Sequence, residues 1–238
     1  MDVGASDPLP GGTPYNAAFD RFPGQYDELR AAGHMARRRA EHFLQVVDSS
    51  PGPVLEVGCG TGTLLRALAA ARPDREFLGV EPLANYVDYA TGRAAEGGLT
   101  NVRFAAATGE ELLSVTERGW AGLVISVDAL HHVTDTDQVV RSVAAAARPG
   151  ARWQAMEPNR VHPYVLAYHV LTAGERTFPY RDFVRRAAAG GWSLAGRTTM
   201  YLYPSGVGRV PPWAERVERR LEHVLPLAGA VVLDLRRR

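Results

Sequence analysis

The sequence of 238 residues contains no lysine, one isoleucine and a single cysteine, Cys59. Without lysine the chain forms neither a Schiff base with pyridoxal phosphate nor the phosphate contact of a P-loop lysine. One cysteine excludes an intrachain disulfide framework and a multi-cysteine metal site, and it suits a reducing compartment. We expect no metal. The use of arginine for every basic residue is typical of a GC-rich bacterial genome.

Net charge and long apolar runs are also scarce. The 27 basic and 26 acidic residues give a formal charge of +1, so the strong positive field of a general nucleic-acid binder is missing and a nucleic-acid partner is not expected. No stretch approaches the roughly 20 apolar residues of a membrane span. The first 14 residues contain acid, proline and glycine where a signal peptide has a basic start and an apolar core. We expect a soluble cytoplasmic protein without a membrane partner, and the oligomeric state stays open.

Short apolar runs and helical patterns alternate through most of the chain. A helical segment in two pieces, interrupted near Pro23 and Gly24, is expected over residues 15–47. Strands are expected at 53–57, 76–80, 101–106, 121–126, 151–157, 192–204 and 228–238. Helices are expected between them, at 63–71, 83–98, 137–147, 161–174, 180–191 and 211–226. Such alternation predicts an α/β domain whose parallel sheet is covered by helices on both faces.

Three glycines follow the first strand of this sheet, in the stretch VLEVGCGTG. Gly58, Gly60 and Gly62 allow a tight turn and remove the Cβ atoms that would keep a ligand away, at the sheet edge where ligands of open parallel sheets bind. The spacing GxGxG differs from the GxGxxG of dinucleotide sites and so favours a ligand without phosphates. Glu81, which ends the second strand, can accept two ribose hydroxyls, and Glu56 adds an anion that suits a cationic ammonium or sulfonium.

At this point the sequence resembles a known family. VLEVGCGTG, the following GVEP, the segment ATGE-L from Ala107, ALHHV from Ala129 and RPGA before the fifth strand are similar to the small-molecule group of class I S-adenosylmethionine-dependent methyltransferases. The resemblance implies a Rossmann-like fold with a mostly parallel seven-stranded sheet and an antiparallel last strand. It also implies S-adenosylmethionine as cofactor, with its methionine part in the glycine loop.

The resemblance and the residue pattern together suggest how the chain is organised around this cofactor. Residues 1–50 are expected to form an N-terminal helical segment that covers the cofactor, and residues 51–238 the methyltransferase domain, with an acceptor-lid insertion at about 158–190. Thr108 stands where many relatives have an aspartate near the adenine. The expected cofactor-binding residues are Tyr15, Glu56, Gly58, Cys59, Gly60, Gly62, Glu81, Pro82, Thr108, Gly109, Glu110 and Val127.

Two histidines are the candidates for catalysis. His132 follows the fourth strand, where acceptor and sulfonium should meet, and an imidazole can take a proton from oxygen or nitrogen at neutral pH. His162 lies in the expected lid, and the alternative for both is a packing role. We expect methyl transfer to an oxygen, nitrogen or carbon of a small, partly apolar acceptor, such as a bacterial secondary metabolite. The alternatives are an NAD(P)-dependent oxidoreductase and a cofactor-binding protein with a non-methylating or regulatory role.

Overall fold

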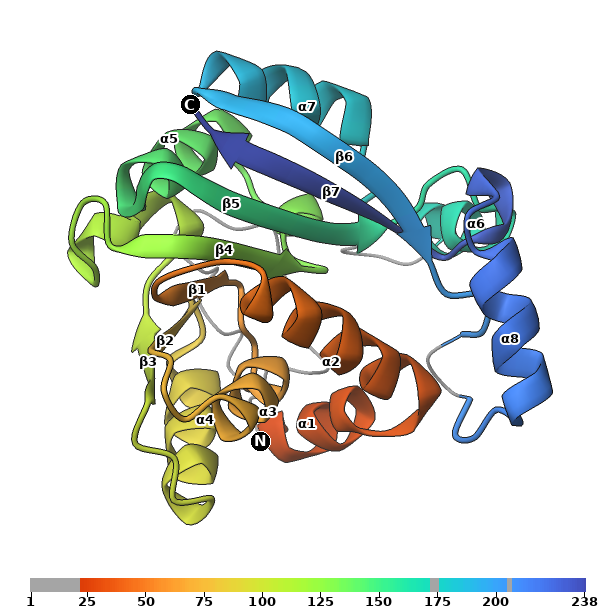
Figure 1. Cartoon of the computed structure of the whole chain (residues 1–238), viewed down its shortest axis with the longest axis horizontal. Coiled ribbons are helices and arrows are strands. Elements are labelled where there is room, and N and C mark those ends of the chain that lie inside the picture. Colours follow the sequence, from red (N-terminus) through yellow and green to blue (C-terminus); the bar gives the residue numbers. More distant parts are fainter. Residues whose placement is uncertain (1–21, 172–175, 205–206) are drawn as a thin grey trace, which may run out of the picture.

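A seven-stranded sheet forms the centre of the computed structural model, which describes residues 22–171, 176–204 and 207–238 (Figure 1). The strand order is β3-β2-β1-β4-β5-β7-β6, and β7 runs antiparallel to both of its neighbours. The remaining pairs are parallel, so the mostly parallel sheet with an antiparallel last strand is confirmed. The strands are β1 (Val54–Val57), β2 (Phe77–Glu81), β3 (Val102–Ala106), β4 (Ala121–Val127), β5 (Ala147–Pro158), β6 (Trp192–Met200) and β7 (Ala230–Arg237).

Helices cover both faces of this sheet. The α-helices are α1 (Pro23–Ala31), α2 (Gly33–Asp48), α3 (Thr63–Ala71), α4 (Ala84–Glu96), α5 (Thr136–Ala146), α6 (Pro163–Leu171), α7 (Tyr180–Ala189) and α8 (Pro212–Leu221). Short 3-10 turns occur at η1 (Gly109–Ser114), η2 (Leu130–His132) and η3 (Leu225–Leu227). Within the described ranges, no helix has the length and apolar character needed to cross a membrane.

Strand alternation divides the core into two halves. Leu55 and Val57 of β1 pack with α5 and α7, in a cluster that contains Trp153 and Phe183. Val54 of β1 packs toward α2 and α3, in a cluster that contains Phe43, Leu65 and Ile125. Because successive side chains of a strand point to opposite faces, Glu56 lies on the same side as Val54, under the N-terminal helices.

The expected two-piece helical segment lies only partly within the described residues. Pro23 begins α1, where proline is tolerated because its missing N–H has no helical partner in the first turn. A further break was not expected. The chain breaks at Gly33, whose φ of +88° suits glycine. Of the two helices within the expected lid at 158–190, α7 packs against α5 and β6 and buries Phe183 in the core. The other, α6, lies at the end of the sheet beside α8 (Figure 1).

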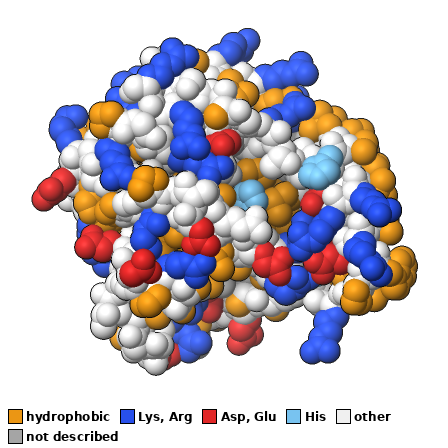
Figure 2. Space-filling model, in the orientation of Figure 1, with side chains coloured by type: hydrophobic (Ala, Val, Ile, Leu, Met, Phe, Trp, Pro, Cys, Tyr) orange, Lys and Arg blue, Asp and Glu red, His pale blue; other side chains and the backbone are white. Residues whose placement is uncertain are grey.

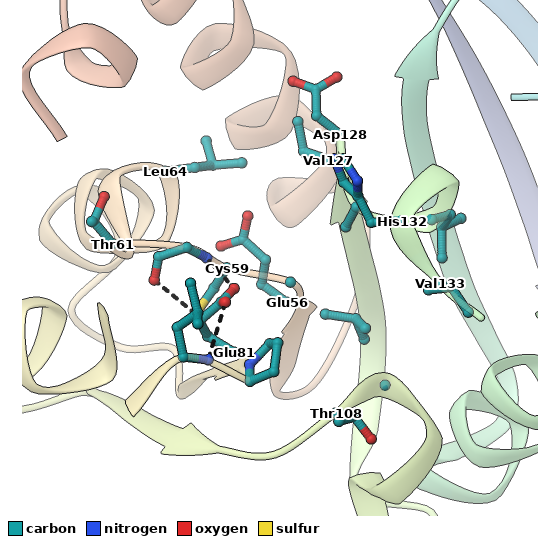
Figure 3. Close-up of a pocket in the computed structure, with 18 of the residues that line it drawn as sticks. Glu56, Cys59, Thr61, Leu64, Glu81, Thr108, Val127, Asp128, His132 and Val133 are labelled. Atoms are coloured by element: carbon teal, nitrogen blue, oxygen red, sulfur yellow. Dashed lines mark hydrogen bonds between the residues drawn. The ribbon is translucent and has the colours of Figure 1, made fainter. Parts of the chain in front are cut away.

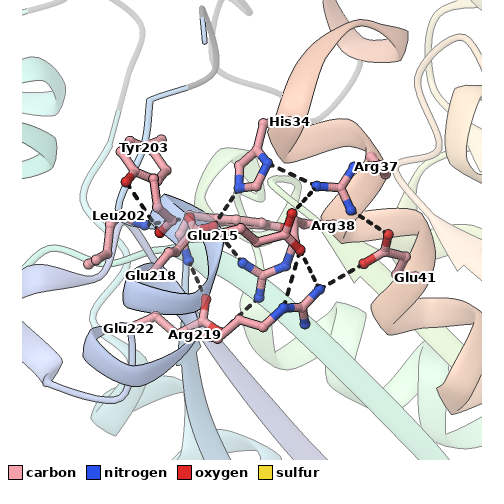
Figure 4. Close-up of polar contacts among 12 residues, drawn as sticks. His34, Arg37, Arg38, Glu41, Leu202, Tyr203, Glu215, Glu218, Arg219 and Glu222 are labelled. Carbon is pink, nitrogen blue, oxygen red and sulfur yellow. Dashed lines mark hydrogen bonds and ion pairs between the residues drawn. The ribbon is translucent and has the colours of Figure 1, made fainter. Parts of the chain in front are cut away.

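A buried ionic cluster joins α2 to α8, which lies between β6 and β7 in the chain (Figure 4). Arg38 donates to Glu218 at 2.6 Å and to Glu222 at 2.8 Å, and all three side chains are at most 6% exposed. His34 also contacts Glu218, and the backbone N–H of Leu202 donates to the same carboxylate. Although burial opposes ionisation, the bond from His34 and the charge of Arg38 lower the pKa of Glu218. The cluster therefore fixes α8 against α2.

Candidate cofactor and methyl-transfer site

The glycine loop connects β1 directly to α3. Gly58, Gly60 and Gly62 all have positive φ, at +72°, +55° and +72°. A Cβ on Gly58 would lie 2.5 Å from the Cβ of Ala129, and one on Gly62 would lie 2.5 Å from the ring of Phe104. Gly58 and Gly62 therefore permit both the turn and its close packing, on the loop after β4 and on a side chain of β3.

Glu81 ties this loop to the end of β2. Its carboxylate accepts the N–H of Gly60 at 3.0 Å and that of Leu83 at 3.3 Å (Figure 3). The N–H groups of Gly58 and Cys59 donate to the carbonyl of Val80 at 2.8 and 3.0 Å. A carboxylate offers about four acceptor positions, so one such group can both hold a loop and accept ligand hydroxyls.

Glu56 lies deep in the same pocket. It is 3% exposed, and its Oε2 has no hydrogen-bond partner among the described residues. Burial raises the pKa of Glu56 to about 8, against the opposing charges of Arg39 and Arg30. Without a bound cation, Glu56 is therefore mostly protonated at neutral pH, and a cationic ligand would favour its ionised form.

Cys59 lines the pocket beside Glu56. Burial raises the pKa of its thiol, with a further contribution from Glu56 and Glu81. A thiol that stays protonated is a poor nucleophile. Its surroundings therefore suit packing under the loop, and its backbone rather than its sulfur holds the turn.

Three charged residues that the sequence analysis did not identify complete one wall of the pocket. Asp128, at φ +52°, follows β4 and accepts Arg30 of α1 at 2.9 Å and Arg39 of α2 at 3.5 Å. Burial opposes ionisation of Asp128, but Arg30 and Arg39 outweigh it and lower the pKa of this carboxyl. The only local signal was the position of Asp128 at the carboxyl end of a strand.

The histidines after β4 differ in their surroundings. His131 is 7% exposed, and its Nδ1 lies 2.6 Å from Glu157. Glu157, near the carboxyl end of β5, also accepts the N–H groups of Ala129 and Leu130. His132 lines the pocket, and its ring centre is 4.0 Å from that of His131. Glu157, which the sequence analysis also missed, therefore fixes the loop that carries His132.

His162 lies outside this pocket. Its Nδ1 accepts the N–H of Val165 at 3.4 Å, at the beginning of α6. The helix instead turns His169 inward, 5.5 Å from the ring of His131. Of the two candidate catalytic histidines, the structure brings only His132 to the glycine loop.

Most of the expected cofactor-binding residues line one pocket at the carboxyl ends of β1 to β4 (Figure 3). Gly62 is not among them, because it begins α3 behind the loop. Tyr15 lies outside the described residues, whereas Tyr26 of α1 lines the pocket. The residues found in the lining are Glu56, Gly58, Cys59, Gly60, Glu81, Pro82, Thr108, Gly109, Glu110 and Val127.

The chemistry of this pocket fits S-adenosylmethionine. Glu81 offers a carboxylate to a ribose diol, Glu56 has a buried oxygen free for an ammonium, and Arg30 and Arg39 can face a carboxylate. Among the residues that the structure describes, no three His, Cys, Asp or Glu side chains are arranged to hold a metal ion.

Comparisons with known proteins agree with this chemistry. Residues 54–150 match the family described as methyltransferase domain. Over 184 residues the chain is 27% identical to a ubiquinone biosynthesis O-methyltransferase of Xylella fastidiosa, a match that covers 75% of this chain and 72% of that protein. Over 113 residues it is 34% identical to a tRNA (guanine-N(7)-)-methyltransferase of Bifidobacterium longum subsp. infantis, covering 45% of this chain and 40% of that protein. The chain therefore contains a methyltransferase domain with the fold of the class I S-adenosylmethionine-dependent methyltransferases.

Solved structures place the methyltransferase in the same fold. A possible histamine N-methyltransferase of Thermotoga maritima has a TM-score of 0.67 at 17% identity, over 93% of this chain and 99% of that one. A geranyl diphosphate C-methyltransferase of Streptomyces coelicolor, solved with S-adenosyl-L-homocysteine, has a TM-score of 0.64 at 16% identity, over 85% and 76%. These structures share the fold of this chain, and the one from Streptomyces coelicolor holds the demethylated product of the cofactor that the resemblance implied.

Proposed function

We propose that this methyltransferase acts on an oxygen, nitrogen or carbon of a small, partly apolar acceptor in the cytoplasm, such as a bacterial secondary metabolite. The observation that carries the proposal is one pocket in which the glycine loop, Glu81 and His132 come together. A protein that methylates tRNA would be expected to have a strongly basic surface. The formal charge of +1 therefore argues against a tRNA acceptor. The tRNA methyltransferase among the relatives makes tRNA an acceptor to be tested directly.

The pocket suggests which groups hold each part of the cofactor. In this proposal Glu81 accepts the ribose hydroxyls, the glycine loop receives the methionine part, and Thr108, Gly109 and Glu110 lie beside the adenine. Arg30 and Arg39 face the carboxylate of the cofactor, with Asp128 holding both guanidinium groups in place. Glu56 faces its ammonium.

Alignment supplies most of the chemistry in this proposal. S-adenosylmethionine supplies an activated methyl group on a sulfonium sulfur. The protein places the acceptor atom in line with that group and excludes water. Where the acceptor carries a proton, the imidazole of His132 takes it, and Glu157 positions the loop of His132 through His131 and the N–H groups of Ala129 and Leu130.

The cofactor assignment is tested by calorimetry. S-adenosylmethionine and S-adenosylhomocysteine should bind the protein, and NAD should bind much more weakly. Glu81→Ala should weaken cofactor binding by about 2–3 kcal/mol, because bonds to a charged acceptor are lost. Glu96→Ala, which removes an exposed acid of α4, is the matched control and should leave the affinity unchanged. Equal affinities for Glu81→Ala and wild type would contradict the ribose assignment.

The role of His132 is tested by kinetics. His132→Ala should lower kcat by about 100-fold or more for an acceptor that must lose a proton, and by less for one already deprotonated, with the cofactor Kd nearly unchanged. His162→Ala should keep kcat and at most raise the acceptor KM. If His162→Ala lost kcat and His132→Ala did not, the base would belong to α6.

The acceptor itself is sought with isotopically methyl-labelled cofactor and a mixture of small metabolites and tRNA, followed by mass spectrometry. A labelled small molecule supports the proposal, and labelled tRNA overturns it. If the protein binds the cofactor but no candidate acceptor becomes methyl-labelled, the non-methylating or regulatory alternative would be favoured.

A further inference from the structure

Exposed apolar side chains are concentrated at one end of the molecule. Of the 15 large apolar side chains exposed among the described residues, 11 lie in two segments, 161–171 and 213–227. The most exposed are Leu171 at 82%, Val170 at 68%, and Tyr164 and Trp213 at 65% each. Scattered single residues of this kind are ordinary on a protein surface, but a cluster of them marks an interaction site.

The two segments lie next to each other. The side chain of Asn159, just before α6, donates to the carbonyls of Leu225 and Ala228 at 2.6 and 2.8 Å, and this joins the base of α6 to η3 after α8. Figure 1 shows α6 and α8 together at one end of the sheet, and Figure 2 shows apolar side chains along the same edge. The two segments therefore form one face, the α6/α8 face.

Helix α8 has the reverse of the usual arrangement. A surface helix normally turns its apolar stripe to the core. In α8, Glu218 is buried against Arg38 of α2, whereas Trp213, Val217 and Leu221, spaced by four residues, are 65%, 43% and 40% exposed. The apolar stripe is thus held outward by the buried ionic cluster of Figure 4.

The charges on the α6/α8 face are of one sign. The exposed charged residues of segments 160–171 and 209–227 are all arginines: Arg160, Arg209, Arg216, Arg219 and Arg220. Of these, Arg219 is paired with Glu41 and Glu215. The acids of α8 point inward, since Glu215 is paired with Arg37 and Arg219, and Glu218 and Glu222 are buried. A partner for this face must bury apolar side chains and supply negative charge for the arginines.

We propose that the α6/α8 face docks on the surface of an anionic phospholipid membrane. Exposed tryptophan and tyrosine suit the boundary between head groups and acyl chains, and arginines beside them suit lipid phosphates. A second copy of the chain fits less well, because a two-fold interface would bring Arg216 and Arg220 against the same arginines with no exposed acid to pair them. Docking there would place α6, and through His169 and His131 the methyl-transfer site, beside the membrane.

The test is flotation of the full-length protein with two kinds of vesicle, phosphatidylcholine alone and phosphatidylcholine with 30% phosphatidylglycerol. The protein should float with the anionic vesicles at least tenfold more than with the neutral ones, and 0.5 M salt should release most of it. The triple variant Trp213→Ser, Val217→Ser and Leu221→Ser should bind at least tenfold more weakly. Arg216→Glu with Arg220→Glu should remove the preference for anionic vesicles.

Controls separate docking from a general loss of structure. Leu113→Ser with Leu194→Ser changes two exposed apolar residues away from the face and should bind as wild type does. Cofactor affinity, measured without vesicles, should be the same in all variants. Absence of binding to anionic vesicles, or an equal loss in the control variant, would overturn the proposal. So would a dimer in light scattering that the triple variant converts to a monomer, since the face would then bind a second copy.

Discussion

The raised pKa of Glu56 predicts how the free energy of unfolding depends on pH. Its pKa is about 8 in the folded protein and close to its ordinary value of 4.5 in the unfolded chain. Between these values the folded state holds a proton that the unfolded state has lost, so the free energy of unfolding falls as pH rises. The contribution is fully present below pH 4.5 and is lost as pH passes through 8. The complete loss is at most about 5 kcal/mol.

The perturbation is Glu56→Gln, which keeps the size of the side chain and removes the titration. Because the folded and unfolded states bind different numbers of protons, the free energy of unfolding of wild type should fall by about 2 kcal/mol from pH 6 to pH 8. The variant should not show this fall. Urea unfolding of both proteins without cofactor, at pH 6 and pH 8, measures it. From pH 6 to pH 8, the free energy of unfolding of the variant should rise by about 2 kcal/mol relative to that of wild type. A difference that stays constant with pH would refute the reasoning.

Cofactor binding provides a second test of the ionisation of Glu56. If Glu56 faces the ammonium of the cofactor, binding should ionise it and release up to about one proton at pH 7. Titration of S-adenosylhomocysteine by calorimetry, in phosphate and in Tris, measures the released protons because the two buffers differ in ionisation enthalpy. Glu56→Gln should release correspondingly fewer. Equal release by both proteins would place the ammonium elsewhere.

Three further predictions concern stability and positioning. Arg38→Met should lower the free energy of unfolding by about 3–5 kcal/mol in urea titrations, because Glu218 and Glu222 stay buried without their partner. As a control, Arg37→Met, which removes a side chain that is 47% exposed, should lower it by under about 1 kcal/mol. Gly62→Ala should cost about 2–4 kcal/mol in the same assay, since its Cβ would meet Phe104, and Gly98→Ala, at φ +66° with open space around it, only about 1 kcal/mol. Glu157→Gln should lower kcat and alter the pH–rate profile while the cofactor Kd is retained; an unchanged profile would show that Glu157 is not a positioning residue.

The sequence was sufficient for the parts of the site that are close together in the chain. The glycine loop follows β1 directly, and Glu81 ends the next strand, so strand ends and turn residues predicted both. Arg30 and Asp128 are 98 residues apart, and their pairing depends on how α1 packs over β4. An arginine in a helical segment has no local feature that distinguishes a pocket wall from a solvated face. The rule that selected Glu81 would also have selected Asp128 and Glu157, because each stands at the carboxyl end of a strand.

Helical patterns were less informative about which side of a helix is buried. The spacing of Trp213, Val217 and Leu221 would ordinarily place that stripe in the core. The opposite face is buried because Arg38 and His34 of α2 compensate Glu218, and these partners are about 180 residues away. The helical pattern over 180–191 is uninformative in a similar way, because it does not distinguish a lid from a helix packed on the sheet.

Helix α2 contacts both the pocket that contains the glycine loop and helix α8. Arg38 and Arg39 are neighbours in the sequence and point to different sides of the helix, because successive residues of an α-helix are turned by about 100°. Arg38 binds the buried acids of α8, and Arg39 lines the pocket and approaches Asp128. The cluster that turns the apolar stripe of α8 outward thus also sets the position of a guanidinium in the cofactor site. A change in Arg38 should therefore affect cofactor affinity through Arg39 as well as stability, whereas changes to the exposed stripe of α8 should leave both unaltered.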